Sequence, residues 1–151
     1  QCYLFEPNPR FFPNLATLLE KYDNVVEISN APAWVDEGRH EFAIDMNELA
    51  YGSTLMKSKV AIWSNATIVE LDTFDFSKYV ERFKDDYLIV KMDIEGGEFP
   101  ILNKMLADNT VRFMDQLWVE VHPNKVTSVT TTESNQLIEK VKEQTQVTLW
   151  H

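Results

Sequence analysis

The sequence predicts an α/β fold in which helices cover both faces of a mostly parallel β-sheet. Strand-like segments alternate with amphipathic helical segments along the chain, which is the pattern of βαβ units with right-handed crossovers. The most apolar strand, Tyr87–Asp93, is rich in β-branched residues and does not alternate, as is typical of a strand buried on both faces of a parallel sheet. The 151 residues are about the length of one domain, so residues 1–151 are predicted to form a single domain.

Apolar spacing and the positions of the prolines predict the first three elements. Cys2–Glu6 is a short apolar strand, and the following Pro-Asn-Pro turn leads into a helix expected over Pro9–Lys21. Asn8 is the expected N-cap of this helix, with proline at the first helical position. Asn24–Ser29 is expected to be the second strand.

The pattern is weaker in the middle of the chain. Glu41–Asp45 and Ala66–Glu70 alternate enough to be strands at a sheet edge. Glu48–Ser58 is polar and contains a glycine, so we expect a mobile surface loop there. Thr73–Phe83 is predicted to be a helix because its apolar residues recur at helical spacing.

The remaining elements return to clear strand and helix patterns. A Gly-Gly pair after Glu95 ends the apolar strand and opens a helix. Gln116–His122 is the next strand. Thr130 and Glu133 form a capping-box pattern that opens another helix. Gln146–Trp150 is expected to close the chain as a strand.

Composition and charge narrow the classes of partner. The formal net charge of -10 opposes a sequence-independent nucleic-acid surface and attraction to an anionic membrane, and it suits a neutral or cationic substrate or a carbohydrate. No apolar run approaches the roughly 18 residues of a membrane span, so none is expected. The single cysteine and the lack of a signal-peptide pattern fit a reducing, cytoplasmic location.

Two strand ends carry paired titratable groups. Asp93-x-Glu95 follows the most apolar strand, and Glu120-x-His122 ends the next one. Period-two alternation places each pair on one side of its strand, so neighbouring strands would direct four groups into one crevice. Such a set suits a general base, an anchor for a substrate hydroxyl, or a site for a divalent metal. The alternative is purely structural, with Glu95 and Glu98 at a helix N-terminus and His122 bonded to a backbone carbonyl.

Glu6 ends the first strand, where dinucleotide-type sites keep an acidic residue for the ribose hydroxyls, about 20 residues after a glycine-rich turn. Counting back from Glu6 places that turn before residue 1, and no G-x-G occurs in the chain. We therefore expect the first strand and the glycine-rich loop of such a fold to be missing from this chain, which would make the domain incomplete at its N-terminus and a possible part of a larger multidomain chain.

Six segments occur in the order found in a known family. They are FEPNP at Phe5–Pro9, NAPAW at Asn30–Trp34, YGSTL at Tyr51–Leu55, ELDTFDF at Glu70–Phe76, KMDIEGGEFPIL at Lys91–Leu102 and VEVHP at Val119–Pro123. The chain resembles FkbM-type methyltransferases over nearly its whole length. The resemblance implies a Rossmann-like class I methyltransferase fold and an S-adenosylmethionine-dependent O-methyltransferase that acts on a hydroxyl of a sugar, a glycan or a similar small molecule.

The resemblance also implies roles for individual residues. Cofactor-binding positions, which would contact the ribose, the adenine and the methionine end, are Glu6, Asn8, Asn30, Ala31 and Asp93. Positions on the acceptor side are Glu95, Glu120 and His122, with Ser53 and Thr54 in a loop over the substrate.

For the reaction, the hypothesis makes His122 the base that takes the hydroxyl proton, because an ordinary histidine is mostly neutral at pH 7. Asp93 or Glu120 would orient His122 or bind the hydroxyl. A metal-assisted version, with Mg²⁺ or a similar ion on Asp93, Glu95 and Glu120, is possible but not favoured by the sequence. Two other functions stay open: a non-catalytic binding domain derived from a methyltransferase, and a nucleotide-sugar enzyme.

Overall fold

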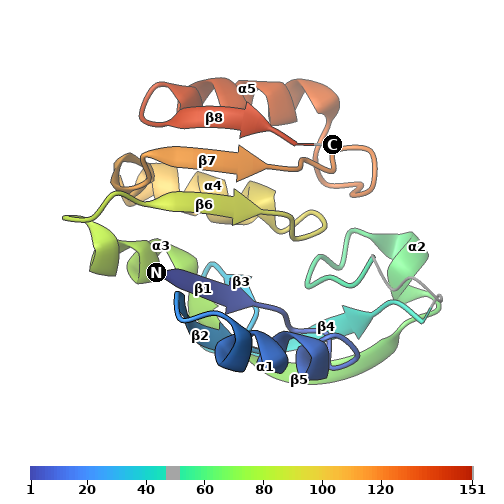
Figure 1. Cartoon of the computed structure of the whole chain (residues 1–151). Helices are drawn as coiled ribbons and strands as arrows, with labels where there is room; N and C mark the ends of the chain where they lie inside the picture. The colour runs from blue at the N-terminus through green and yellow to red at the C-terminus, as the bar shows by residue number, and fades with distance from the viewer. Residues whose placement is uncertain (47–51, 151) are drawn as a thin grey trace.

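The computed structural model describes residues 1–46 and 52–150, which form three small sheets of two, three and three strands with helices between them (Figure 1). All strand pairs are parallel except one. The predicted α/β class with mostly parallel strands is therefore confirmed. No helix in the described part of the chain is both long and apolar enough to cross a membrane.

The C-terminal sheet has three parallel strands, which are β6 (Ile89–Met92), β7 (Gln116–Val119) and β8 (Gln146–Leu149). Its connections contain α4 (Glu98–Ala107), the short 3-10 helix η2 (Val111–Phe113) and α5 (Thr131–Lys142). Figure 1 shows α4 behind β6 and β7. The predicted capping box of Thr130 and Glu133 is present at the start of α5.

The N-terminal sheet pairs β1 (Cys2–Phe5) with β2 (Val25–Ser29) in parallel, and α1 (Phe12–Lys21) connects them. The helix begins three residues later than predicted, and its N-cap is Phe11 rather than Asn8. The Asn8 carbonyl instead accepts from the backbone N–H of Phe11, and its side-chain oxygen accepts from the backbone N–H of Arg10. Asn8 thus closes a turn before the helix.

The middle sheet has the order β3-β5-β4, and its strands are β3 (Ala33–Trp34), β4 (Gly38–Ile44) and β5 (Thr67–Asp75). β4 and β5 are antiparallel. The predicted helix over Thr73–Phe83 is wrong at its start, because β3 and β4 pair with the residues up to Asp75 and keep them extended. Helix α3 (Phe76–Val80) begins there, capped by the Asp75 carboxylate, and the 3-10 helix η1 (Glu81–Phe83) follows.

The segment that follows β4 was predicted to be a mobile surface loop. Of the predicted loop Glu48–Ser58, residues 48–51 lie outside the described part, and the rest precedes α2 (Val60–Trp63). Thr54 is 1% exposed and exchanges two backbone hydrogen bonds with Ala43. Residues 52–58 form a loop, as predicted, but the surface position is wrong for Thr54, whose buried backbone groups pair with Ala43.

The main hydrophobic core lies between the C-terminal sheet and helices α3, α4 and α5, and its fully buried members include Ile101, Leu102, Met105, Leu117 and Val141. The opposite face of this sheet is open: Ile89 is 55% exposed and Trp118 is 39% exposed. The prediction that the apolar strand is buried on both faces is therefore wrong for this chain. In the described residues, helices cover one face of β6–β8 only.

Strands β1 and β6 point in the same direction in Figure 1, but they are not paired with each other. Each has a single partner among the described strands, β2 for β1 and β7 for β6. Each therefore keeps one edge with backbone groups that a further parallel strand would pair. The expectation of an additional first strand stays a prediction.

Candidate active site

The carboxyl ends of β1, β6 and β7 meet at a cavity of about 490 Å³. Glu6 and Asn8 line it after β1, Asp93 after β6, and Glu120 after β7. Phe5, Phe11, Trp34 and Phe42 provide aromatic walls. Ligands of open α/β folds bind outside the carboxyl ends of the strands, and the volume is in the range of small-molecule sites.

The turn after β6 has an unusual backbone. Glu95 has φ 55° and Gly96 has φ 105°, which are both left-handed values. Gly96 is required here, because an added Cβ would lie 2.5 Å from a Val126 methyl carbon in addition to the backbone strain. A non-glycine residue held in this region is strained and is often found at functional sites.

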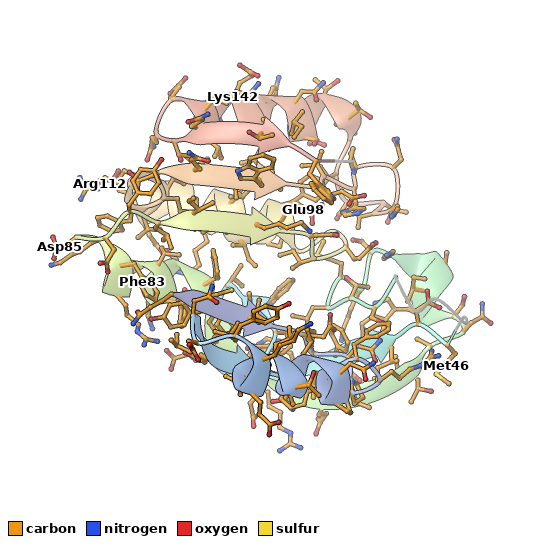
Figure 2. The ribbon with its side chains drawn as sticks, viewed as in Figure 1. Met46, Phe83, Asp85, Glu98, Arg112 and Lys142 are labelled. Atoms are coloured by element: carbon orange, nitrogen blue, oxygen red, sulfur yellow. The ribbon has the colours of Figure 1, made fainter. Side chains whose placement is uncertain are left out.

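Glu98 is the first residue of α4 and is fully buried. Its carboxylate accepts hydrogen bonds from the backbone N–H of Gly96 and of His122, both at 2.8 Å, and lies 3.2 Å from Nδ1 of His122. Figure 2 shows Glu98 near the carboxyl ends of β6 and β7. In the neutral ring, a proton on Nδ1 donated to Glu98 would leave a lone pair on the other ring nitrogen, Nε2.

Nε2 of His122 is buried and has no hydrogen-bond partner among the described residues. Three carboxylate oxygens surround it: Glu120 Oε1 at 3.4 Å, Glu95 Oε1 at 3.6 Å and Asp93 Oδ1 at 3.9 Å. The structure therefore brings together the four groups that the sequence predicted at the two strand ends. The sequence had no signal for the orientation of the imidazole by Glu98, which it suggested only as an acid at a helix N-terminus.

Glu95 is engaged by other groups. Its Oε2 pairs with the buried ammonium of Lys59 and lies 3.4 Å from Nζ of Lys125, and its carbonyl accepts from the Thr54 hydroxyl at 3.0 Å. Lys59 also donates to the carbonyl of Gly52. These bonds fasten the segment after β4 to the turn after β6.

At the other end of the cavity, Oε1 of Glu6 accepts from the backbone N–H of Asn8 at 2.8 Å. Asn8 is 1% exposed and donates through Nδ2 to the Ser53 hydroxyl at 3.2 Å. Burial raises the pKa of Glu6, and the bond from Asn8 opposes this rise. Ser53, predicted to lie in a loop over the substrate, therefore contacts Asn8 at the predicted cofactor end of the cavity.

Burial and like charges shift the pKa values of the groups at the other end of the cavity, near Asp93 and Glu120. Burial raises the pKa of Asp93, and the neighbouring Glu120 carboxylate raises it further. For His122, burial on its own lowers the pKa, but the hydrogen bond to Glu98 and the charges of Glu98 and Glu95 outweigh it, so the pKa is raised. The expectation of an ordinary histidine pKa was therefore wrong.

Three other predicted positions, Asn30, Ala31 and Thr54, do not line the cavity. Asn30 is exposed, and Ala31 donates its N–H to the Ser29 hydroxyl; the cavity is lined by the next residues, Pro32 to Trp34. The Thr54 hydroxyl is already bonded to Glu95. The binding roles of these residues stay predictions.

Parallel strands that end at one acidic cavity define an α/β protein with a cavity at its sheet edge. The model of a family described as the methyltransferase FkbM domain matches residues 1–145. The chain therefore belongs to the FkbM methyltransferase family, which confirms the resemblance and supports a methyltransferase in general. None of the curated proteins and none of the solved structures compared with the chain matches it.

Proposed function

We propose that the chain is an S-adenosylmethionine-dependent O-methyltransferase that methylates a hydroxyl of a sugar, a glycan or a similar small molecule. The observation that carries the proposal is that a single cavity joins Glu6 and Asn8 at one end to Asp93 and Glu120 at the other. The cofactor site and the acceptor site must be neighbours for methyl transfer, because the two reactants have to be held in line.

The residues at the cofactor end fit a nucleoside. Glu6 offers a carboxylate, which is the group that commonly binds ribose hydroxyls. Its Oε1 already accepts from the backbone N–H of Asn8, which fixes the side chain. The aromatic rings of Phe5, Phe11 and Trp34 give apolar surface for a purine. When bound, the cofactor supplies an electrophilic methyl group, which bonds to the acceptor oxygen as the carbon–sulfur pair returns to sulfur.

The acceptor end fits a hydroxyl. Asp93, Glu120 and His122 are proposed to bind it and to make its oxygen nucleophilic, and its proton leaves during the reaction. Carboxylates are strong acceptors for the hydroxyl proton. Nε2 of His122 has two chemical uses here, as a proton acceptor or as a metal ligand. The Asp93 and Glu120 groups are within reach of the same oxygen, since both approach Nε2.

Calorimetry with S-adenosylhomocysteine tests the proposal. We expect binding to the protein, and we expect Glu6→Gln to weaken it by about 10-fold or more, the loss of one hydrogen bond to a charged group. The matched control is Glu20→Gln, which removes an exposed carboxylate on α1. Binding of a uridine diphosphate instead would favour the nucleotide-sugar enzyme, and binding of neither would favour a non-catalytic domain.

A further inference from the structure

The geometry points to a divalent-cation site formed by Asp93, Glu120 and His122 at the acceptor end of the cavity, of the class that takes Mn²⁺ and similar first-row ions. The function assigned to this ion rests on the proposed methyl transfer, but the site itself does not. The three side chains come from two neighbouring strand ends, and one ligand atom from each lies within 4.8 Å of the others.

The distances suit a shared ion. Nε2 of His122 lies 3.4 Å from Glu120 Oε1 and 3.9 Å from Asp93 Oδ1. Ligand atoms that are each about 2.0–2.2 Å from one ion are separated by roughly 3–4 Å. Only small side-chain rotations are therefore needed. Asp93 is exposed, Glu120 half-buried and His122 buried, so the site is open on the cavity side and backed by protein.

The imidazole gives evidence that the acidic residues alone would not. Nε2 of His122 is buried, is directed at the carboxylates and has no hydrogen-bond partner in the part of the chain that the structure describes. A buried polar atom without a partner is costly, and native structures seldom leave one without a reason. A cation between Nε2 and the two carboxylate oxygens would satisfy it.

Glu98 prepares His122 for this role. Its Oε1 lies 3.2 Å from Nδ1 and also accepts the His122 backbone N–H at 2.8 Å. A metal-binding histidine almost always donates its other ring N–H to a carboxylate, a carbonyl or a water, which fixes the ring and makes the ligating nitrogen more basic. Glu98 is therefore a positioning residue for the ion.

The structure also distinguishes Glu95 from the two proposed carboxylate ligands. Glu95, one of the three carboxylates considered for a metal from the sequence, is neutralised by Lys59 and Lys125. The proposed ligand set has the His122 imidazole in place of the Glu95 carboxylate. This changes the favoured ion, because imidazole suits Mn²⁺, Fe²⁺ or Zn²⁺ better than Mg²⁺ or Ca²⁺. Lys91, whose Nζ lies 3.9 Å from Asp93, is the cation that an ion would displace.

In the proposed reaction, three protein ligands leave coordination positions for the acceptor hydroxyl. The ion would bind the hydroxyl oxygen and lower its pKa, so that the proton passes to a free carboxylate oxygen or to water before the oxygen takes the methyl group. His122 then acts as a ligand and not as the base.

Titration of the metal-free protein with Mn²⁺, followed by electron paramagnetic resonance of the free ion, tests the site without cofactor or acceptor. We expect one bound ion per chain, and binding at least about 10-fold weaker in Glu120→Gln and in His122→Gln. Glu20→Gln, with the same charge change on α1, should bind as the unaltered protein does. Thermal unfolding without metal shows which variants are folded, and Glu120→Gln, whose side chain is 28% exposed, tests the site where His122→Gln fails to fold.

Absence of stoichiometric binding, or equal affinity in Glu120→Gln and Glu20→Gln, would overturn the metal site. The outcome is separable from the proposed function. Binding of S-adenosylhomocysteine without Mn²⁺ binding overturns the metal site and leaves the methyltransferase. Binding of Mn²⁺ without S-adenosylhomocysteine supports the site and counts against the methyltransferase.

Discussion

Replacing Glu98 by glutamine removes one charge and exchanges one oxygen for an amide group without a large change of shape. In the unaltered protein, the two carboxylate oxygens accept from the backbone N–H groups of Gly96 and His122 and face Nδ1 of His122. Glutamine keeps one acceptor only. Whichever way the amide turns, its NH₂ group faces one of the two backbone N–H donors.

The magnitude follows from this geometry. One buried backbone donor loses its acceptor, at a cost of about 1–3 kcal/mol in the free energy of unfolding. For a chain of this size, each kcal/mol lowers the unfolding midpoint by roughly 2–4 °C. If the amide turns its NH₂ to His122, that group donates to Nδ1, and the ring proton moves to Nε2. If the amide oxygen faces His122 instead, Nδ1 keeps its acceptor but loses the negative charge that makes Nε2 more basic. Both arrangements weaken Nε2 as a ligand, so Mn²⁺ affinity should fall by about 10- to 100-fold.

Chemical denaturation gives the stability change, and the ¹⁵N chemical shifts of the His122 ring report which nitrogen carries the proton. Glu20→Gln is the matched control and should change the stability by less than about 0.5 kcal/mol, as is usual for an exposed substitution. A Glu98→Gln protein as stable as this control, with an unchanged ring proton, would refute the role given to Glu98.

Three further changes test other parts of the site. Gly96→Ala should lower the free energy of unfolding by about 1–3 kcal/mol in a denaturation experiment, because its φ is 105° and Val126 occupies the space; Gly38→Ala, whose added Cβ meets nothing closer than 3.4 Å, is the control and should change little. Lys59→Met should lower the free energy of unfolding by about 3–5 kcal/mol, since it leaves the buried Glu95 carboxylate poorly paired. Adding Glu95→Gln should recover part of this loss, and full additivity of the two changes would contradict the pairing. Burial raises the pKa of Glu6 above its ordinary value of 4.5. The affinity for S-adenosylhomocysteine should therefore be constant above the raised pKa and should decrease as the pH falls through it. A similar decrease in Glu6→Gln would exclude Glu6 as its source.

The site residues at the strand ends were predictable from local sequence, because the alternation of side chains along a strand and the position just after its carboxyl end can both be read there. Asp93, Glu120 and His122 each follow a short apolar strand, and parallel pairing of β6 with β7 brings the strand ends together. The sequence could not show the orientation of His122, because Glu98 reaches it across 24 positions from another element. Lys59 is a similar case, since it meets Glu95 only after the chain has crossed β5 and β6.

The errors in the fold have physical causes of the same kind. The helical spacing in Thr73–Phe83 was real, but pairing with β3 and β4 held Thr73 to Asp75 extended. Tertiary pairing therefore outweighed a local pattern. The apolar run of β6 indicated burial on both faces, yet Ile89 is 55% exposed because no described helix covers that side. The apolar residues of β6 favour burial, but whether another element packs on this face cannot be read from the strand's own sequence.

The charge distribution near Asp93 and Glu120 supports the proposed binding of a cation there. Four carboxylates gather around one imidazole, but two of them already have partners: Glu95 pairs with Lys59 and Lys125, and Glu98 accepts hydrogen bonds from the backbone N–H groups of Gly96 and His122. Asp93 and Glu120 are left to repel each other, which contributes to the raised pKa of Asp93. Lys91 offsets this repulsion only weakly, because its ammonium is 54% exposed and 3.9 Å away. A bound divalent ion, or the sulfonium charge of a methyl donor, would balance the two remaining carboxylates. In the proposed arrangement the ion would lie beside Nε2, and the sulfonium would lie on the side of the cavity that leads to Glu6.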